Sequence, residues 1–266
     1  MIKEFIKAHG LGNDFLIAVS DDLTLNKLDI VRILDRNRGF GGDGLILFRP
    51  DETYDFEMKL FNQDGGEAEI SGNGLRCLAH VINYKNLTPK MSFTVHTKVG
   101  PRFLEIISVN NNKALIFEEM GEVSCKESLM DLEGVFSNSV IAALEVSVGN
   151  PHLVVFFDSI DGIDLEYAGK KVQALYKDGI NLEVATFHES DILMKVFERG
   201  VGLTQSCGSG SVAIAKAAQY YFQTGLPVKV VNPGGTLTVE ERESIFYMTG
   251  ESEIIGSVAP IELRPA

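Results

Sequence analysis

Ser71 and Cys207 are the residues of this chain whose type and setting best suit proton transfer. They lie 136 positions apart, and each precedes a Gly-x-Gly sequence and an apolar run that is typical of a buried helix. A side chain at such a helix start meets backbone N–H groups that have no partner inside the helix. One segment therefore places a hydroxyl, and the other a thiol, beside groups that can bind an anion.

The segments around these two residues belong to a longer internal repeat. The matched segments, in chain order, are 12–17 with 149–154, 43–46 with 178–181, 61–79 with 197–215, and Gly100 with Gly235. Their separations are 137, 135, 136 and 135 residues. Matches that keep their order in both halves predict a duplication into two domains, whereas two copies of this length do not suit a solenoid.

Length, composition and charge narrow the class of protein. A chain of 266 residues, 45% of them hydrophobic, can form one large or two ordinary domains with real cores. The net charge of −13 argues against a nucleic-acid or anionic-membrane surface, because phosphates attract lysine and arginine. One local cation would still suffice for an anionic small-molecule substrate. No apolar run reaches the roughly 18 residues of a membrane span.

The cysteines and the N-terminus bear on location. Cys77, Cys125 and Cys207 suit a reducing compartment, and their spacing fits no zinc pattern. Residues 1–5 do not resemble a signal peptide. We therefore expect a cytoplasmic protein that binds neither nucleic acid nor membrane, and the sequence indicates no metal.

Strand patterns outnumber helical ones along the chain. Two apolar runs predict helices over residues 72–83 and 208–222, and these helices should be buried because apolar residues surround most of their circumference. Strands are predicted over residues 15–19, 44–48, 56–61, 92–96, 114–118, 153–157, 192–197, 228–231, 236–239 and 245–248.

These elements predict an α+β fold of two pseudo-symmetric strand-rich domains, each a barrel-like sheet wrapped around a central helix. We expect the first domain over residues 1–118 and the second over 119–255. The junction is expected in residues 119–139, which lie between the two repeat units. The tail 256–266 is expected to pack back onto the first domain. The active site is expected in the cleft between the domains, with Ser71 and Cys207 on its two sides.

Two acid–base groups on opposite sides of one carbon can invert its configuration. One group removes the α-hydrogen while the other delivers a proton to the opposite face. The helix start should lower the pKa of the Cys207 thiol below about 8.5, and its N–H groups should stabilise charge on a carboxylate. This chemistry requires neither a metal nor a cofactor.

The chain resembles the diaminopimelate epimerases, in the wider group of cofactor-independent amino-acid racemases and epimerases. The resemblance implies a homodimer that epimerises LL-diaminopimelate to meso-diaminopimelate by two-base proton transfer, in lysine and peptidoglycan precursor biosynthesis. It rests on HGLGNDF (9–15), FNQDGGEAE (61–69), GNGLRC (72–77), VGNPHLV (148–154), DGINLE (178–183), ERGVGLTQSCGSG (198–210), NPGGTL (232–237) and YMTG (247–250).

The two bases of that family are cysteines, and this chain keeps one of them. Cys207 matches the second cysteine, whereas Ser71 occupies the position of the first. An alcohol is far less acidic than a thiol, so the chain is expected to bind substrate but to epimerise it poorly. The serine is either a deliberate substitution that traps a ligand complex or natural in a divergent relative. The family pattern is otherwise kept around the site, which favours a deliberate substitution.

The resemblance assigns roles to further residues. His152 and Glu198 match the pair that assists the cysteines, and Arg199 matches the residue that clamps the distal carboxylate, for which a guanidinium fork is suited. The other positions implied in substrate binding are the asparagines Asn13, Asn62, Asn150 and Asn181 around the distal amino-acid group, and Gly72, Asn73, Gly208 and Ser209 at the reacting carboxylate.

Two other functions stay open on the sequence alone. One is a racemase of another amino acid, such as histidine, although Arg199 and the asparagines favour a substrate with a second carboxylate. The other is a non-catalytic amino-acid-binding relative, in which Ser71 has abolished turnover. A serine hydrolase built from Ser71 and His152 is disfavoured, because the Gly-x-Ser-x-Gly turn is missing and Cys207 would have no role.

Overall fold

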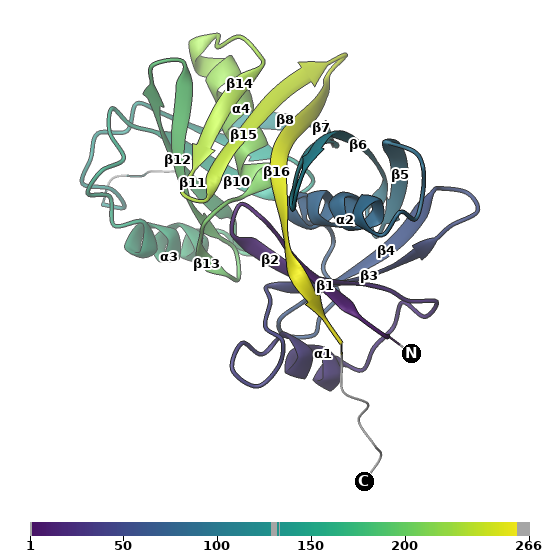
Figure 1. Cartoon of the computed structure of the whole chain (residues 1–266). Helices are drawn as coiled ribbons and strands as arrows, with labels where there is room; N and C mark the ends of the chain where they lie inside the picture. The colour runs from purple at the N-terminus through teal and green to yellow at the C-terminus, as the bar shows by residue number, and fades with distance from the viewer. Residues whose placement is uncertain (1, 129–131, 133, 260–266) are drawn as a thin grey trace. The chain divides into compact units, whose positions relative to one another are not determined.

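Strands dominate the computed structural model, which describes residues 2–128, 132 and 134–259 (Figure 1). The predicted α+β class is confirmed. The chain divides into two compact units, the first running to Glu118 and resuming at Glu251, the second comprising Glu119–Gly250. Residues 129–131 and 133 of the predicted junction, and 260–266 of the predicted tail, lie outside the described residues.

The first unit is a closed sheet of eight strands around helix α2 (Gly72–Tyr84). Neighbouring strands in chain order are hydrogen-bonded, and the last strand pairs with the first, so the sheet closes on itself. A short helix, α1 (Lys27–Leu34), packs on the outer face through Ile30 and Leu34. The strands are β1 (Phe5–Gly10), β2 (Asn13–Val19), β3 (Gly44–Pro50), β4 (Phe56–Asn62), β5 (Ser92–Thr97), β6 (Gly100–Asn110), β7 (Lys113–Glu122) and β16 (Ile245–Val258).

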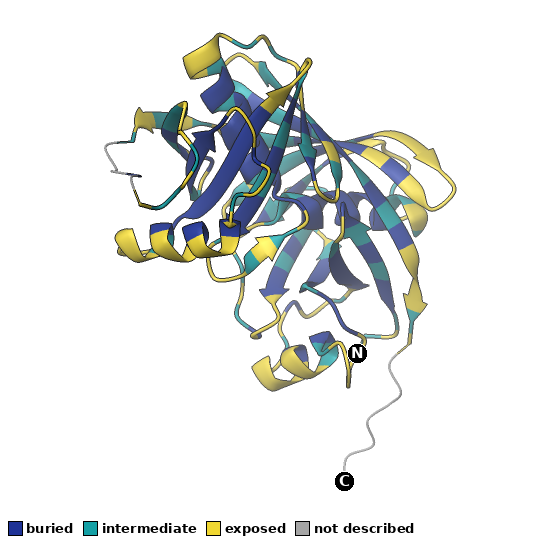
Figure 2. Cartoon of the chain, turned by 90° about the vertical axis from the view of Figure 1, so that its left-hand side faces the viewer, coloured by how far each residue is buried: buried dark blue, intermediate teal, exposed yellow. Residues whose placement is uncertain are grey.

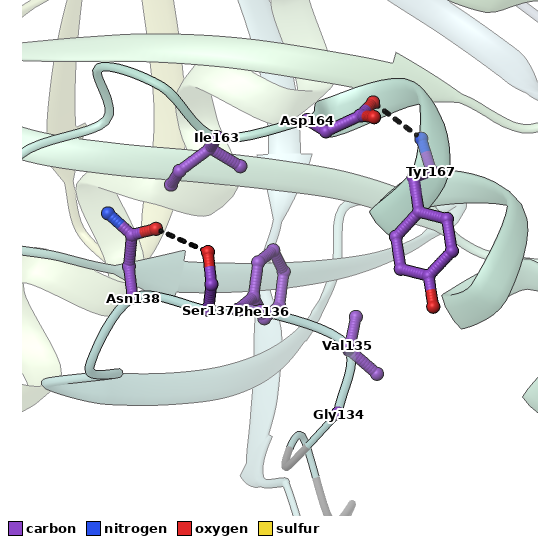
Figure 3. Close-up of a pocket in the computed structure, with 8 residues that line it drawn as sticks. All are labelled: Gly134, Val135, Phe136, Ser137, Asn138, Ile163, Asp164 and Tyr167. Carbon is purple, nitrogen blue, oxygen red and sulfur yellow. Dashed lines mark hydrogen bonds between the residues drawn. The ribbon is translucent and has the colours of Figure 1, made fainter.

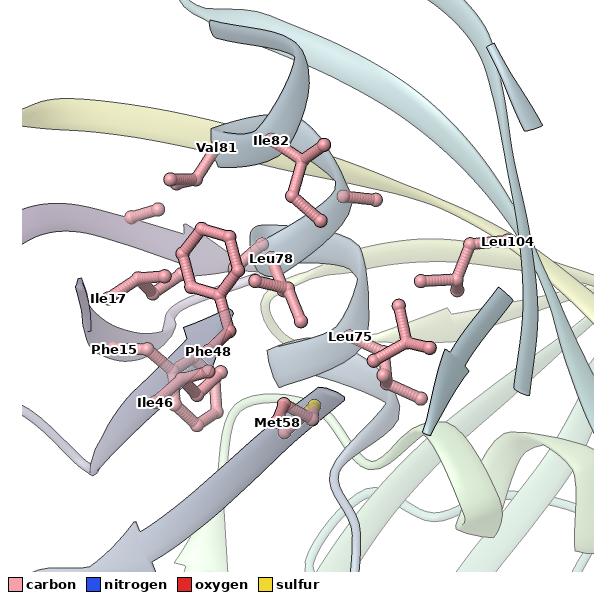
Figure 4. Close-up of a cluster of buried hydrophobic side chains, with 14 of the residues drawn as sticks. Phe15, Ile17, Ile46, Phe48, Met58, Leu75, Leu78, Val81, Ile82 and Leu104 are labelled. Carbon is pink, nitrogen blue, oxygen red and sulfur yellow. The ribbon is translucent and has the colours of Figure 1, made fainter. Parts of the chain in front are cut away.

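Helix α2 is held by apolar side chains spaced three and four residues apart. Leu75, Leu78 and Ile82 point into a cluster that includes Phe15 and Ile46 of the surrounding strands (Figure 4). Burying one such side chain contributes roughly 1.5–3 kcal/mol relative to leaving it in water. The core therefore fixes where α2 begins, and with it the position of the residue before the helix.

The second unit is built around helix α4 (Gly208–Phe222), in which Val212 and Ile214 are fully buried. Helix α3 (Leu165–Leu175) has an exposed outer face and a buried inner face (Figure 2). No helix among the described residues is long and apolar enough to cross a membrane. The strands, in addition to part of β16, are β8 (Ser124–Glu127), β9 (Ala142–Ser147), β10 (Pro151–Phe156), β11 (Asn181–His188), β12 (Asp191–Glu198), β13 (Gly202–Thr204), β14 (Val228–Asn232) and β15 (Gly235–Arg242).

Both units run through the same order of strand pairings. The first pair in each is antiparallel, the second parallel and the third antiparallel, for β1 to β4 as for β9 to β12. The next three pairs also agree. The first of them is parallel and the other two are antiparallel, for β4 to β7 as for β12, β14, β15 and β16. This shared topology confirms the predicted pseudo-symmetric fold.

The sheet register defines which residues of the two units correspond. Phe15 pairs with Gly44 in the first unit, and His152 pairs with Asn181 in the second. We call two residues counterparts when they occupy the same position, in the strand pairing or along the central helix, of the two units. The counterpart of Gly44 is thus Asn181, so the match of residues 43–46 with 178–181 is wrong by two residues. Both segments contain Asp-Gly, which favours a turn before a strand whatever the register.

Candidate active site

Ser71 and Cys207 are the N-cap residues of α2 and α4, as predicted. Each side chain accepts a hydrogen bond from the N–H three residues on: Ser71 Oγ from Gly74 at 3.1 Å, and Cys207 Sγ from Gly210 at 3.3 Å. The earlier N–H groups of a first turn lie beyond the reach of helical hydrogen bonding and suit a carboxylate. In these two helices they belong to Gly72, Asn73, Gly208 and Ser209.

A buried histidine and a buried glutamate belong to the surroundings of Cys207. His152 on β10 and Glu183 on β11 have fully buried side chains, and His152 Nδ1 lies 2.7 Å from Glu183 Oε1. The other ring nitrogen, Nε2, lies 3.0 Å from Asn150 Oδ1. Leu153 and Leu182, the neighbours in sequence, join the hydrophobic cluster on the opposite face of the sheet. Strand alternation thus places His152 and Glu183 on one face.

Glu198, at the end of β12, joins this group through Cys207, with which it shares a hydrogen bond. Thr204 Oγ1 donates to Glu198 Oε1. Burial raises the pKa of Glu198, and the negative charge of Glu183 raises it further. A carboxyl group with a raised pKa can hold a proton and exchange it with a neighbouring thiol. We call Cys207, His152, Glu183, Glu198 and Asn150 the second half-site.

The pKa of Cys207 is raised well above that of a free thiol, so the prediction of a lowered pKa is wrong. Burial is the largest cause, followed by the charges of Glu198 and Glu183. Hydrogen bonds from Ser209 and from the Gly210 N–H act in the opposite direction but are outweighed. The prediction rests on the helix start alone, whose N–H groups favour a thiolate. In the fold β11 and β12 bring the carboxylates of Glu183 and Glu198 to this helix start, and they disfavour a thiolate. The residue therefore rests as a thiol, which can deliver a proton.

The Ser209 hydroxyl links Asn150 to the Cys207 thiol. Asn150 Nδ2 donates to Ser209 Oγ at 3.4 Å, and Ser209 Oγ lies 3.6 Å from Cys207 Sγ. Asn232, on β14, accepts a hydrogen bond from the backbone N–H of Cys207 at 3.2 Å. Sequence analysis did not single out Glu183, Thr204 or Asn232. Each lies within a motif of the resemblance, Glu183 in DGINLE, Thr204 in ERGVGLTQSCGSG and Asn232 in NPGGTL, and this was the signal that could have found them.

Asn181 and Arg199 lie together in the second unit. Asn181 Oδ1 accepts from the Arg199 backbone N–H at 2.8 Å, and Asn181 Nδ2 donates to Pro151 O at 3.0 Å. The Asn181 side chain is therefore engaged by the backbone and shapes the end of the strand. The Arg199 side chain is exposed, and its Nη1 donates to Asp178 O at 3.2 Å. An exposed guanidinium is accessible to a carboxylate.

Around Ser71 the first unit brings Asn73 and Asn13 together, and we call these three residues the first half-site. Asn73 Nδ2 donates to Asn13 Oδ1 at 3.2 Å, and Asn13 Nδ2 donates to Asp43 Oδ2 at 2.8 Å. Asn62, also predicted to bind substrate, ends β4 with an exposed side chain. The structure thus joins Asn13 to Asn73 by a hydrogen bond, whereas Asn62 lies on β4, two strands away from Asn13 on β2.

One turn into α2 a buried ion pair supports the first half-site. Arg76 donates to Asn73 Oδ1 and lies 2.6 Å from Glu118, and the side chains of Arg76 and Glu118 are fully buried. Burial raises the pKa of Glu118 to about 7 although Arg76 stands beside it. This pair orients the Asn73 amide, which in turn contacts Asn13.

The described residues of the second unit line hollows, two of which differ in their position relative to the second half-site. One, of about 510 Å³, is lined by Glu198, by Gly200–Leu203 and by α3 residues such as Lys170, so it borders the second half-site. The other, of about 280 Å³, is lined by residues that include Phe136, Ile163 and Tyr167 (Figure 3). It contains none of the residues predicted to act on a substrate.

Comparison with known proteins gives consistent similarities. The profile of a family described as diaminopimelate epimerase matches residues 5–126 and 144–255. A diaminopimelate epimerase of Halothermothrix orenii is 35% identical, with 94% of this chain and 95% of the relative covered. One of Methanococcus maripaludis is 33% identical, with 95% and 97% covered.

A solved structure shares the fold at low sequence identity. The phenazine biosynthesis protein of the PhzF family from Bacillus anthracis superposes with a TM-score of 0.79 at 15% identity, and 98% of this chain and 99% of that chain are covered. At this level of identity the likeness establishes the two-unit strand-rich architecture and no activity.

Proposed function

Because this chain belongs to the diaminopimelate epimerase family, we propose that it binds diaminopimelate and is built to invert one α-carbon without a cofactor, in lysine and peptidoglycan precursor biosynthesis. The observation that carries the proposal is the second half-site. There a thiol at a helix start is surrounded by His152, Glu183 and Glu198, which is a setting for moving a proton to and from carbon.

In this proposal Cys207 serves one face of the α-carbon. Its raised pKa keeps it protonated, so it delivers a proton to the carbanion that is left when the group on the opposite face removes the α-hydrogen. In the reverse direction Cys207 first passes its proton to Glu198, and the thiolate then removes the α-hydrogen from its own face. The N–H groups of Gly208 and Ser209 bind the adjacent carboxylate and stabilise the charge that spreads onto it. Glu198, whose pKa is also raised, returns a proton to the sulfur. His152 lies beside these acidic groups, with its Nδ1 2.7 Å from Glu183 Oε1.

The opposite face belongs to Ser71 in this proposal, and the chemistry requires both half-sites to reach the same substrate. Ser71 Oγ already accepts from Gly74 N–H, which is the same capping bond that Cys207 makes. A hydroxyl at this position resembles a thiol in size but loses its proton far less readily. We therefore propose that this chain binds substrate and epimerises it poorly, whether the serine is natural or introduced.

The test is α-hydrogen exchange in deuterated water with LL- and meso-diaminopimelate, on this chain and on Ser71→Cys. We expect the parent chain to exchange from one face only and to favour one stereoisomer. Ser71→Cys should raise inversion at least about 100-fold, the usual minimum contribution of a general acid–base group. If Ser71→Cys stays inactive on every amino acid tried while the parent binds normally, the chain is a binding protein instead.

Arg199 distinguishes diaminopimelate from amino acids that lack a distal carboxylate. Arg199→Lys replaces a two-pronged donor with a point charge, so diaminopimelate affinity should fall roughly tenfold. Calorimetry measures this directly, with histidine as the comparison ligand. An unchanged diaminopimelate affinity, or tighter binding of histidine by the parent chain, would favour a racemase of another amino acid.

Assembly and location complete the proposal. Family membership supports a homodimer, which light scattering or sedimentation of the purified chain would detect. A biosynthetic role on a small amino acid also supports a cytoplasmic location, and fractionation of cells that express the chain measures it.

A further inference from the structure

We propose that Glu183 is a positioning residue of the second half-site. It holds the His152 ring in a charged state and in one orientation. Through that ring it fixes Asn150 and the Ser209 hydroxyl beside Cys207. The structural part of this inference stands on the contacts within the second unit, while its catalytic consequence rests on the function proposed above.

The Glu183 carboxylate is buried. Its side chain has no exposed surface, and Oε2 finds no hydrogen-bond partner among the described residues. A buried carboxylate is strongly unfavourable unless a cation or several donors face it. The group at Oε1, 2.7 Å away, is Nδ1 of His152. The imidazole is therefore the partner that compensates this charge.

The contacts of the His152 ring determine which of its nitrogens carry protons. A neutral imidazole carries one N–H, whereas an imidazolium donates from both nitrogens. Nδ1 faces the Glu183 carboxylate, and Nε2 faces the amide oxygen of Asn150, which is only an acceptor. The Asn150 amide nitrogen is directed to Ser209 Oγ. Two acceptors at the two nitrogens require a ring that donates twice and carries a positive charge.

An unbroken series of contacts joins the Glu183 carboxylate to the Cys207 thiol. Glu183, His152, Asn150, Ser209 and Cys207 follow one another at 2.7, 3.0, 3.4 and 3.6 Å. The carboxyl groups around the ring come from two further strands: Glu183 on β11 contacts Nδ1, and Glu198 on β12 interacts with the ring through its charge. The imidazolium thus lies between two carboxyl groups, one of which shares a hydrogen bond with the Cys207 thiol.

Glu183 approaches the first turn of α4 closely. A Cβ added at Gly210 would lie 2.6 Å from Glu183 Oε1. The glycine therefore leaves room for the carboxylate in the first turn of α4. In the first unit the counterparts are Gly74 and Ile46, and there an isoleucine side chain packs against the glycine. Glu183→Ile is therefore a substitution that this scaffold already accommodates once.

The direct test is the protonation of His152 in the full chain labelled with ¹⁵N-histidine, with His152→Gln used to assign its signal. In the parent we expect Nδ1 and Nε2 both protonated near neutral pH. In Glu183→Ile and in the isosteric Glu183→Gln, Nδ1 should lose its proton while Nε2 keeps its own. Glu145→Gln, in the neighbouring strand β9, is the matched control and should leave the His152 signals unchanged.

The catalytic test uses the same variants in the Ser71→Cys background. Glu183→Gln and Glu183→Ile should lower kcat at least about tenfold, while Glu145→Gln should not. Circular dichroism checks that each variant is folded. If Glu183→Ile does not fold, Glu183→Gln alone still provides the test. The inference is overturned if Nδ1 stays protonated in both variants or if kcat matches the background. If Ser71→Cys turns over no amino acid, the proposed function fails, whereas the NMR result still decides the role of Glu183.

Discussion

The two half-sites use one scaffold and surround it with opposite chemistry. In each unit a capping side chain precedes a Gly-x-Gly helix start, and the second glycine packs against a strand. At Gly74 the neighbours include Ile46 and Phe15, whereas at Gly210 Glu183 stands in the place of that isoleucine. The counterpart of Phe15 is His152. The fold therefore decides where the capping side chain lies, and two strand residues decide how charged its surroundings are.

The buried charges of the first unit lie elsewhere, one turn further along the helix. Arg76 and Glu118 form a buried ion pair there. Their counterparts in the second unit are Val212 and Met248, which are both fully buried. Met248 corresponds to Glu118 because it pairs with Val239, and Glu118 pairs with Leu104 at the same position of the first unit. A central helix of this fold thus accepts either an ion pair or an apolar pair at one level. The ion pair is retained where it contacts Asn73.

The largest effect should follow from breaking that ion pair. Arg76→Met leaves Glu118 buried without a partner, and the free energy of unfolding should fall by about 3–5 kcal/mol. Adding Glu118→Met makes the first unit resemble the second, so most of the stability should return. Urea denaturation measures both variants. A double variant as unstable as the single one would mean that the two units do not tolerate the same core.

A smaller effect should separate the two glycines. Gly210→Ala places a methyl group against the carboxylate that bonds His152, so the free energy of unfolding should fall by about 1–3 kcal/mol. Gly74→Ala meets Ile46 Cδ1 at 3.1 Å, and a gain in helix propensity of about 1 kcal/mol offsets the crowding. Thermal or chemical denaturation of both variants makes the comparison. Equal losses would show that the charged surroundings add no constraint.

The smallest effect is a pH dependence of the stability that arises from His80 in the first unit. Its counterpart in the second unit is Lys216. Burial lowers the pKa of His80 to about 4, from an ordinary value of 6.5. The unfolded chain therefore takes up a proton first, and stability is full above pH 6.5 and declines as the pH falls toward 4. Between pH 7 and 5 the loss should be about 1 kcal/mol. His80→Gln should flatten this decline, whereas the exposed His188→Gln should not, as denaturation curves at both pH values would reveal.

Much of the scaffold follows from the sequence alone. Helices were predicted over 72–83 and 208–222, and the structure has them at Gly72–Tyr84 and Gly208–Phe222. This succeeds because the apolar periodicity, the glycine pattern and the capping residue are all local signals. The internal repeat likewise predicts two units with one topology, because equivalent sequences make equivalent strand pairings.

Other elements carried too little local signal. Helix α3 contains Gly169 in its interior, which weakens a helical prediction. The structure gives the reason: a Cβ at Gly169 would lie 2.2 Å from the Phe197 ring, so glycine allows α3 to approach β12 closely. Strand β11 is buried on both faces over most of its length and lacks the polar–apolar alternation that reveals a strand.

The chemical character of the site was decided by tertiary structure. The sequence by itself determined that a thiol and a hydroxyl cap two buried helices, since capping depends on residues three positions apart. It did not determine the direction of the Cys207 pKa shift. Desolvation and the charges of Glu183 and Glu198 set that direction, and these groups reach the sulfur only when β11 and β12 pack against α4. Charge interactions act through space, so no pattern along the chain records them.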